Sequence, residues 1–155
     1  MVTTDEIVMQ APPDAIFRAA SEVERWPHLL PHYRWVKVLE RDGDACLVEM
    51  AARRGPFPVK WTSLKTQDAE ALTVHYRHVG GPTRGMRVVW LIEPGPDGTL
   101  VSIVHDFRLE IPVLRSLPGQ LIIGHCFVKP IANRTLQHLK AHVEASSCAE
   151  PSLPE

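Results

Sequence analysis

The sequence has no excess of charge of either sign. Its 155 residues contain 17 Lys and Arg against 18 Asp and Glu, which gives a formal net charge of -1. Proteins that are drawn to nucleic acid or to anionic membranes by their overall charge carry a surplus of Lys and Arg. We therefore expect no nucleic-acid partner and no attraction to anionic membranes.

Long hydrophobic runs are also missing. No apolar stretch approaches the roughly 20 residues that a membrane-spanning helix needs, and the N-terminus begins with polar residues rather than with a signal peptide. The three cysteines, Cys46, Cys126 and Cys148, are widely separated and odd in number. This favours free thiols in a reducing compartment. We expect no integral membrane association and a cytoplasmic location.

Motifs for several common chemistries are absent. The chain has no Gly-x-Ser-x-Gly elbow, no phosphate-binding loop and no dinucleotide fingerprint. His138 and His142 are four residues apart, but no acidic third ligand is near, so a solvated helix face is the better interpretation than a metal site. His105 and Asp106 are adjacent on an expected strand and point to opposite faces, so they are not a catalytic dyad. We expect neither a metal nor a cofactor.

The order of expected elements indicates an α+β domain. A short strand at Glu6–Gln10 precedes Pro12 and Pro13, which open a short helix over Asp14–Ala20, and a second short helical segment or compact turn follows at Glu22–Pro31. Period-two patterns then predict six consecutive strands with short links, an antiparallel meander. They are Trp35–Leu39, Cys46–Met50, Val59–Thr66, Leu72–Val79, Met86–Ile92 and Leu100–Leu109.

Helical periodicity returns near the C-terminus. Apolar residues spaced by three, four or seven predict one long helix over Leu117–Ala145. Pro130 lies inside it, removes a backbone donor and crowds the carbonyl of Cys126, so we expect a kink or break there. Residues 1–145 are expected to form a single domain, and residues 146–155, small and polar, a flexible tail.

A curved sheet that packs one face on a single helix can leave space between the two layers. Such a space, lined by apolar side chains and a few polar groups, is typical of small-molecule sites. A packed solid core is the alternative. We expect any pocket to be reached near the short helices and the bend at Pro130.

Three segments carry a resemblance to a known family. Glu22–Tyr33 with its Trp26-Pro27 pair, the hairpin Val38–Gly43 and the run Val104–Phe107 resemble the START-like polyketide cyclase/dehydrase and lipid transport superfamily. The resemblance covers roughly residues 5–145 and is strongest to aromatase/cyclases, with coenzyme Q-binding proteins as near relatives. It implies a helix-grip fold: a curved antiparallel sheet of six or seven strands around a long C-terminal helix, with a deep pocket between them.

The resemblance also implies site residues. In aromatase/cyclases one strand carries tryptophan, serine and arginine at alternate positions facing the pocket, and the matching positions here are Trp61, Ser63 and Lys65. Lysine in place of arginine is not a conservative change, because arginine offers a planar fork of donors. Tyr33 and Trp26 match aromatic pocket residues, and His105 falls at a polar pocket position. These six residues form the predicted ligand site, and Tyr33, Ser63 and Lys65 are its predicted catalytic groups.

Two classes of function are consistent with such a pocket. One is an enzyme that folds a poly-β-ketone and helps it to cyclise and dehydrate without a cofactor, with an acyl carrier protein as its expected partner. The other is a non-catalytic carrier or chaperone of a lipid, quinone or polyketide. A stress or toxin-partner protein of the same fold is a third possibility. In the first two cases the protein binds a hydrophobic small molecule.

Overall fold

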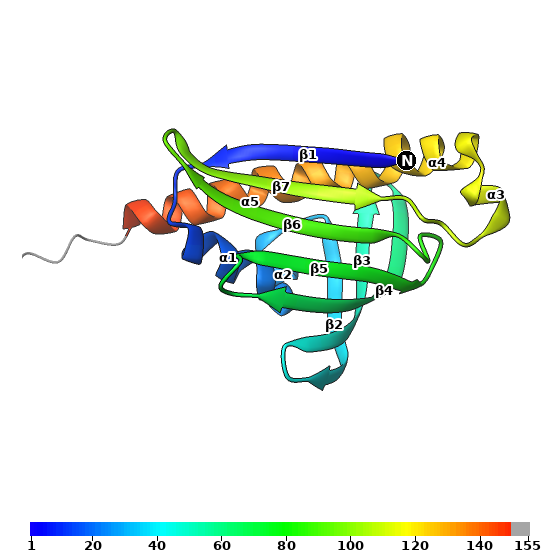
Figure 1. Ribbon diagram of the computed structural model, residues 1–155, viewed down its shortest axis with the longest axis horizontal. Coiled ribbons are helices and arrows are strands. Elements are labelled where there is room, and N and C mark those ends of the chain that lie inside the picture. The colour runs from blue at the N-terminus through cyan, green and yellow to red at the C-terminus, as the bar shows by residue number, and fades with distance from the viewer. Residues whose placement is uncertain (150–155) are drawn as a thin grey trace, which may run out of the picture.

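The computed structural model describes residues 1–149, in which one curved antiparallel sheet is crossed by a long helix (Figure 1). The strands lie in the order β1-β7-β6-β5-β4-β3-β2, and every neighbouring pair is antiparallel. The predicted helix-grip sheet of six or seven strands is confirmed. The strands are β1 (Val2–Met9), β2 (Tyr33–Asp42), β3 (Ala45–Arg54), β4 (Phe57–Asp68), β5 (Thr73–Gly80), β6 (Arg87–Gly95) and β7 (Gly98–Asp106).

The first strand along the chain, β1, pairs with the last strand, β7. In this register Thr3 lies opposite His105 and Asp5 lies opposite Ile103. Because side chains alternate between the two faces of a strand, Asp5 and His105 are diagonal neighbours on the same face, and both are buried. The pairing of β1 with β7 therefore brings together a carboxylate and an imidazole that lie 100 residues apart in the sequence.

The two short helical segments after β1 are present. Helix α1 (Pro13–Ser21) begins with proline, whose missing N–H costs nothing in the first turn. The segment predicted as a short helix or turn contains η1 (Val23–Arg25) and α2 (Trp26–Leu29). The Trp26 indole donates to the carbonyl of Ala19 at 3.0 Å, which holds this side chain inside the molecule.

The long helix is interrupted just before Pro130. Helix α4 (Leu117–Ile123) passes into a π-helical segment, η2 (Gly124–Val128), and then into α5 (Lys129–Ala149). The Lys129 N–H donates to the Gly124 carbonyl, so the helix is widened where Pro130 has no N–H for the Cys126 carbonyl. The predicted irregularity is confirmed. A short helix, α3 (Pro112–Arg115), was not predicted.

Helix α5 extends past the predicted end at Ala145 to Ala149. The remainder of the predicted tail, residues 150–155, lies outside the described residues. Over residues 1–149, no helix is both long enough and apolar enough to cross a membrane.

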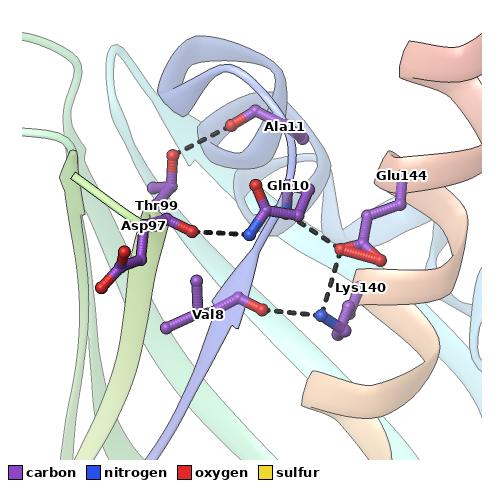
Figure 2. Close-up of polar contacts among 7 residues, drawn as sticks. All are labelled: Val8, Gln10, Ala11, Asp97, Thr99, Lys140 and Glu144. Atoms are coloured by element: carbon purple, nitrogen blue, oxygen red, sulfur yellow. Dashed lines mark hydrogen bonds and ion pairs between the residues drawn. The ribbon is translucent and has the colours of Figure 1, made fainter. Parts of the chain in front are cut away.

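The second half of α5 is fastened to one end of the sheet (Figure 2). The Gln10 backbone N–H donates to Glu144 at 2.9 Å, and the Gln10 side chain donates to the Asp97 carbonyl at 2.6 Å. Lys140 donates to the Val8 carbonyl at 2.8 Å and pairs with Glu144 at 3.1 Å. Buried Leu136, Leu139 and Val143 fill the space behind these contacts. This end of the layer between helix and sheet is closed, which leaves the other end for a cavity.

Candidate functional site

A cavity lies between the sheet and the first half of the long helix. It encloses about 90 Å³, less than the roughly 300–1,000 Å³ of sites that hold drug-sized ligands. Among the described residues that line it, none is Asp, Glu, Lys or Arg. The lining residues are Trp26, Tyr33, Met50, Val59, Trp61, Tyr76, His78, Thr83, Met86, Val88, Trp90, Ile103, His105, Phe127, Val128, Ile131, Ala132 and Thr135.

Four half-buried residues mark the entrance. Val59 and Trp61 belong to β4, and Phe127 and Ile131 flank the irregular turn of the long helix at Pro130. The predicted position of the opening, near the bend at Pro130, agrees with these residues. The short helices contribute the inner wall instead, since Trp26 is fully enclosed.

One wall of the cavity is a continuous row of rings from four strands and α2. The ring centroids of neighbouring members lie 5.8 Å apart for Trp90 and Trp26, 5.1 Å for Trp26 and Tyr33, and 6.1 Å for Tyr33 and Trp61. His78 continues the row, stacked on Trp61 at 5.8 Å with 4° between the ring planes. Such a wall presents flat, polarisable surface to a ligand.

Two tyrosines line the cavity. Burial raises the pKa of Tyr33 well above its usual range, and the nearby Thr135 hydroxyl offsets part of this rise. Burial also raises the pKa of Tyr76, with smaller contributions from Tyr33 and Cys46. Both phenols are therefore protonated at neutral pH and can donate a hydrogen bond. The Tyr76 hydroxyl is buried without a hydrogen-bond partner, so its donor is left for a ligand.

We expect Tyr76→Phe to raise the free energy of unfolding by about 1 kcal/mol, because it removes a buried hydroxyl without a partner. Tyr33→Phe is the matched control and should lower the free energy of unfolding by a similar amount, since Tyr33 loses its interaction with Thr135. Urea unfolding at neutral pH measures both. Equal destabilisation by the two variants would show that the Tyr76 hydroxyl is already satisfied.

Two buried histidines complete the polar part of the wall. His78 Nδ1 lies 2.6 Å from the Thr83 hydroxyl oxygen. Burial lowers the pKa of His78 to about 3 and the pKa of His105 to about 4. Both imidazoles are therefore neutral at pH 7, and a neutral imidazole can accept a proton at one nitrogen while it donates at the other. His105 lines the cavity, and its Nδ1 is buried without a hydrogen-bond partner.

Four of the six predicted site residues line this cavity: Trp26, Tyr33, Trp61 and His105. The predicted separation of His105 from Asp106 is also confirmed, since Asp106 turns to Arg108 at 2.8 Å. The structure therefore brings together residues from α2, β2, β4 and β7 that lie far apart in the sequence.

The other two predicted residues do not line the cavity. Trp61, Ser63 and Lys65 share the concave face of β4, as their alternation predicts, but the strand rise places Lys65 roughly 13 Å from Trp61. Lys65 lies instead in a separate surface depression beside α1 and η1, where its ammonium donates to Gln67 at 2.8 Å. Burial lowers the pKa of Lys65. Ser63 is completely buried, and its hydroxyl has no partner.

Tyr76 and His78 were missed by the sequence analysis. Both lie on β5, in the expected strand Leu72–Val79, and their period-two spacing with Val74 places all three on the concave face. The alternation of inward and outward side chains along that strand could have identified Tyr76 and His78 as cavity residues. Asp5 left no comparable signal, because nothing in the sequence indicates that β1 pairs with β7.

This arrangement, a curved sheet closed on a long helix around an apolar cavity with neutral polar groups, defines a ligand-binding protein of the START-like helix-grip class. The chain belongs to the polyketide cyclase / dehydrase and lipid transport family, whose model matches residues 9–122. It is a ligand-binding protein of the polyketide cyclase type.

Individual relatives agree with this assignment. The chain is 32% identical over 111 residues to a protein of Streptomyces cyaneus that bears the name polyketide cyclase, covering 70% of this chain and 73% of that one. It is 33% identical over 100 residues to the actinorhodin polyketide synthase bifunctional cyclase/dehydratase of Streptomyces coelicolor, covering 63% of this chain and 32% of that one. The Zhui aromatase/cyclase from Streptomyces sp. R1128 shares the fold, with a TM-score of 0.79, 18% identity and 93% of each chain covered.

Proposed function

We propose that the protein binds a poly-β-ketone chain in this cavity and promotes its cyclisation and dehydration. The main support for this proposal is the row of side-chain rings from Trp90 to His78 along the cavity wall. A polyketide becomes flatter as a new ring forms and loses water, so its contact with a flat wall improves along the reaction. Interactions that strengthen toward the transition state are the ones that accelerate a reaction.

The neutral polar groups supply the proton transfers. Nε2 of His105 takes a proton from a methylene between two carbonyl groups, and the electron pair left on carbon attacks a ketone carbon further along the chain. The phenol of Tyr33 or Tyr76 donates to the ketone oxygen as it becomes an alkoxide. The protonated His105 then returns its proton to that oxygen, which becomes a hydroxyl group. In the dehydration, neutral His105 removes a second methylene proton and passes it to this hydroxyl, which leaves as water while the electron pair on carbon forms the new double bond. No oxidant or reductant is needed.

The substrate must enlarge the cavity. A cavity volume of about 90 Å³ is too small for a chain with several ketones, so we expect Trp61 and Phe127 at the entrance to move apart on binding. Their half-buried positions allow this without opening the packed layer behind Leu136 and Leu139.

The proposed partner is an acyl carrier protein that presents the chain in the cytoplasm. It is supported by the similarity to a cyclase/dehydratase of a polyketide synthase. Carriage of a lipid or quinone, the alternative function, would use the apolar wall but would need none of the proton transfers assigned to the tyrosines and His105.

The test combines conversion with binding. A polyketide synthase that releases an unreduced poly-β-ketone is reconstituted with and without the protein, and the products are separated by liquid chromatography and mass spectrometry. We expect the protein to redirect the mixture toward one cyclised, dehydrated product. An unchanged mixture would favour the carrier. Binding is measured with 1,8-dihydroxyanthraquinone, a flat product-like probe, by quenching of tryptophan fluorescence.

We expect Trp61→Ala to weaken binding of this probe about tenfold, because it removes one ring from the wall. Trp35→Ala is the matched control. Trp35 lies outside the cavity, where Arg34 and Lys37 stack on its ring and Glu49 accepts its N–H. Equal loss of affinity in the two variants would contradict the proposed location of the ligand.

A further inference from the structure

Two buried polar atoms are left without partners where β1 meets β7. They are Oδ2 of Asp5 and Nδ1 of His105. The exposed fractions of the two residues are 4% and 7%, so water cannot freely satisfy either atom. A buried polar atom without a hydrogen bond typically costs about 1–3 kcal/mol. A pairing of these two atoms would remove both costs together.

The strand register makes that pairing possible. Asp5 lies opposite Ile103, and His105 is two residues further along β7 on the same face. Diagonal neighbours in an antiparallel pair are roughly 7–8 Å apart at the backbone, within reach of long or aromatic side chains that lean toward each other. His105 lines the cavity, and Asp5 lies near enough to its ring to raise its pKa.

The other oxygen of Asp5 is already held. Lys129 donates to Oδ1 of Asp5 at 2.7 Å, and the Lys129 side chain is half exposed. This ion pair occupies one oxygen of the carboxylate, and an ionised carboxylate only accepts hydrogen bonds. The free oxygen Oδ2 can therefore pair with His105 only when the imidazole carries its proton on Nδ1.

We propose that Asp5 is a positioning residue that places the proton of neutral His105 on Nδ1 and so leaves Nε2 unprotonated toward the cavity. Lys129 balances the charge of Asp5. The bond closes by a small rotation of the two side chains, and it strengthens when His105 takes a proton from the substrate, because the carboxylate then faces an imidazolium. The catalytic consequence rests on the proposed function, but the tautomer of His105 does not.

The charged and titratable groups around His105 agree with this assignment. Burial has the largest effect and lowers the pKa of His105, Asp5 raises it, and Lys129 lowers it. His78, on β5, is a further neighbour, and its pKa is lowered by His105 in addition to burial. Asp5 is thus the group that favours a proton on this imidazole.

The test is the tautomer of His105, read from the two ring nitrogen shifts in long-range proton–nitrogen correlation spectra of the ¹⁵N-labelled protein at pH 7.5. We expect Nδ1–H in the parent protein. Asp5→Leu should abolish this preference, and Lys129→Arg, which keeps a cation beside Asp5, should preserve it. Turnover should fall about tenfold or more in Asp5→Leu, with binding of 1,8-dihydroxyanthraquinone unchanged.

The outcomes separate the two proposals. The same His105 tautomer in the parent and in Asp5→Leu would overturn the role of Asp5, whatever the turnover. If Asp5→Leu does not fold, an Nε2–H tautomer in the parent or in Lys129→Arg would overturn it. A tautomer that depends on Asp5 in a protein that converts no polyketide would support the pair and would overturn the proposed function instead.

Discussion

Replacing His105 with glutamine is expected to lower the rate of polyketide cyclisation by roughly 10²–10⁴-fold, the usual contribution of a general acid–base group. Glutamine keeps a polar side chain at the cavity wall but cannot take up a proton near neutral pH. Binding should persist, because the rings from Trp90 to Trp61 are untouched. Product formation under single-turnover conditions gives the rate, and fluorescence quenching by 1,8-dihydroxyanthraquinone gives the affinity.

The matched control for this substitution is His75→Gln. His75 is an exposed residue on β5, where it contacts Thr73. This variant should cyclise the polyketide at the parental rate. If His105→Gln is as active as His75→Gln, His105 has no catalytic role and the proton transfer must come from another wall residue. His78→Gln would then be the next variant to examine, since His78 is the other imidazole on the wall.

Much of the fold could be predicted from the sequence, because each element has a local cause. Period-two patterns mark β2 to β7, and Pro13 and Pro130 mark a helix start and an irregular helical turn through their missing N–H groups. The spacing of apolar residues marks α5. These patterns leave open the partner of β1, because the pairing of β1 with β7 joins strands that lie far apart in the sequence.

The candidate site could be predicted only in part for the same reason. Alternation correctly places Trp61, Ser63 and Lys65 on one face of β4, but it gives no position for the cavity along the strand. The long helix sets that position: its residues from Phe127 to Thr135 line the cavity, whereas buried Leu136, Leu139 and Val143 fill the layer beyond. Lys65 therefore lies beside α1 and η1, outside the cavity. The position of Asp5 next to His105 depends on the pairing of β1 with β7.

Lowering the pH from 7.5 to 5.0 is expected to reduce the free energy of unfolding by about 6 kcal/mol through three buried histidines. Their pKa values lie below the usual 6.5: about 4 for His32, about 3 for His78 and about 4 for His105, with burial as the main cause in each. The unfolded chain binds protons at these positions below pH 6.5, whereas the folded protein does not. The stabilisation is therefore complete above pH 6.5 and is lost as the pH falls toward 4.

Each of the three histidines contributes about 2 kcal/mol to this loss by pH 5.0, which together approaches the whole stability of an ordinary domain, about 5–15 kcal/mol. The protein should therefore unfold in mild acid. Urea unfolding at pH 7.5 and pH 5.0 measures the loss directly. His78→Gln should reduce it by about 2 kcal/mol, because a neutral amide replaces a group that the unfolded chain would protonate, and the exposed His75→Gln should not. A loss that is the same in both variants would mean that His78 has the same pKa in the folded and the unfolded protein, so that burial does not keep this imidazole neutral in acid.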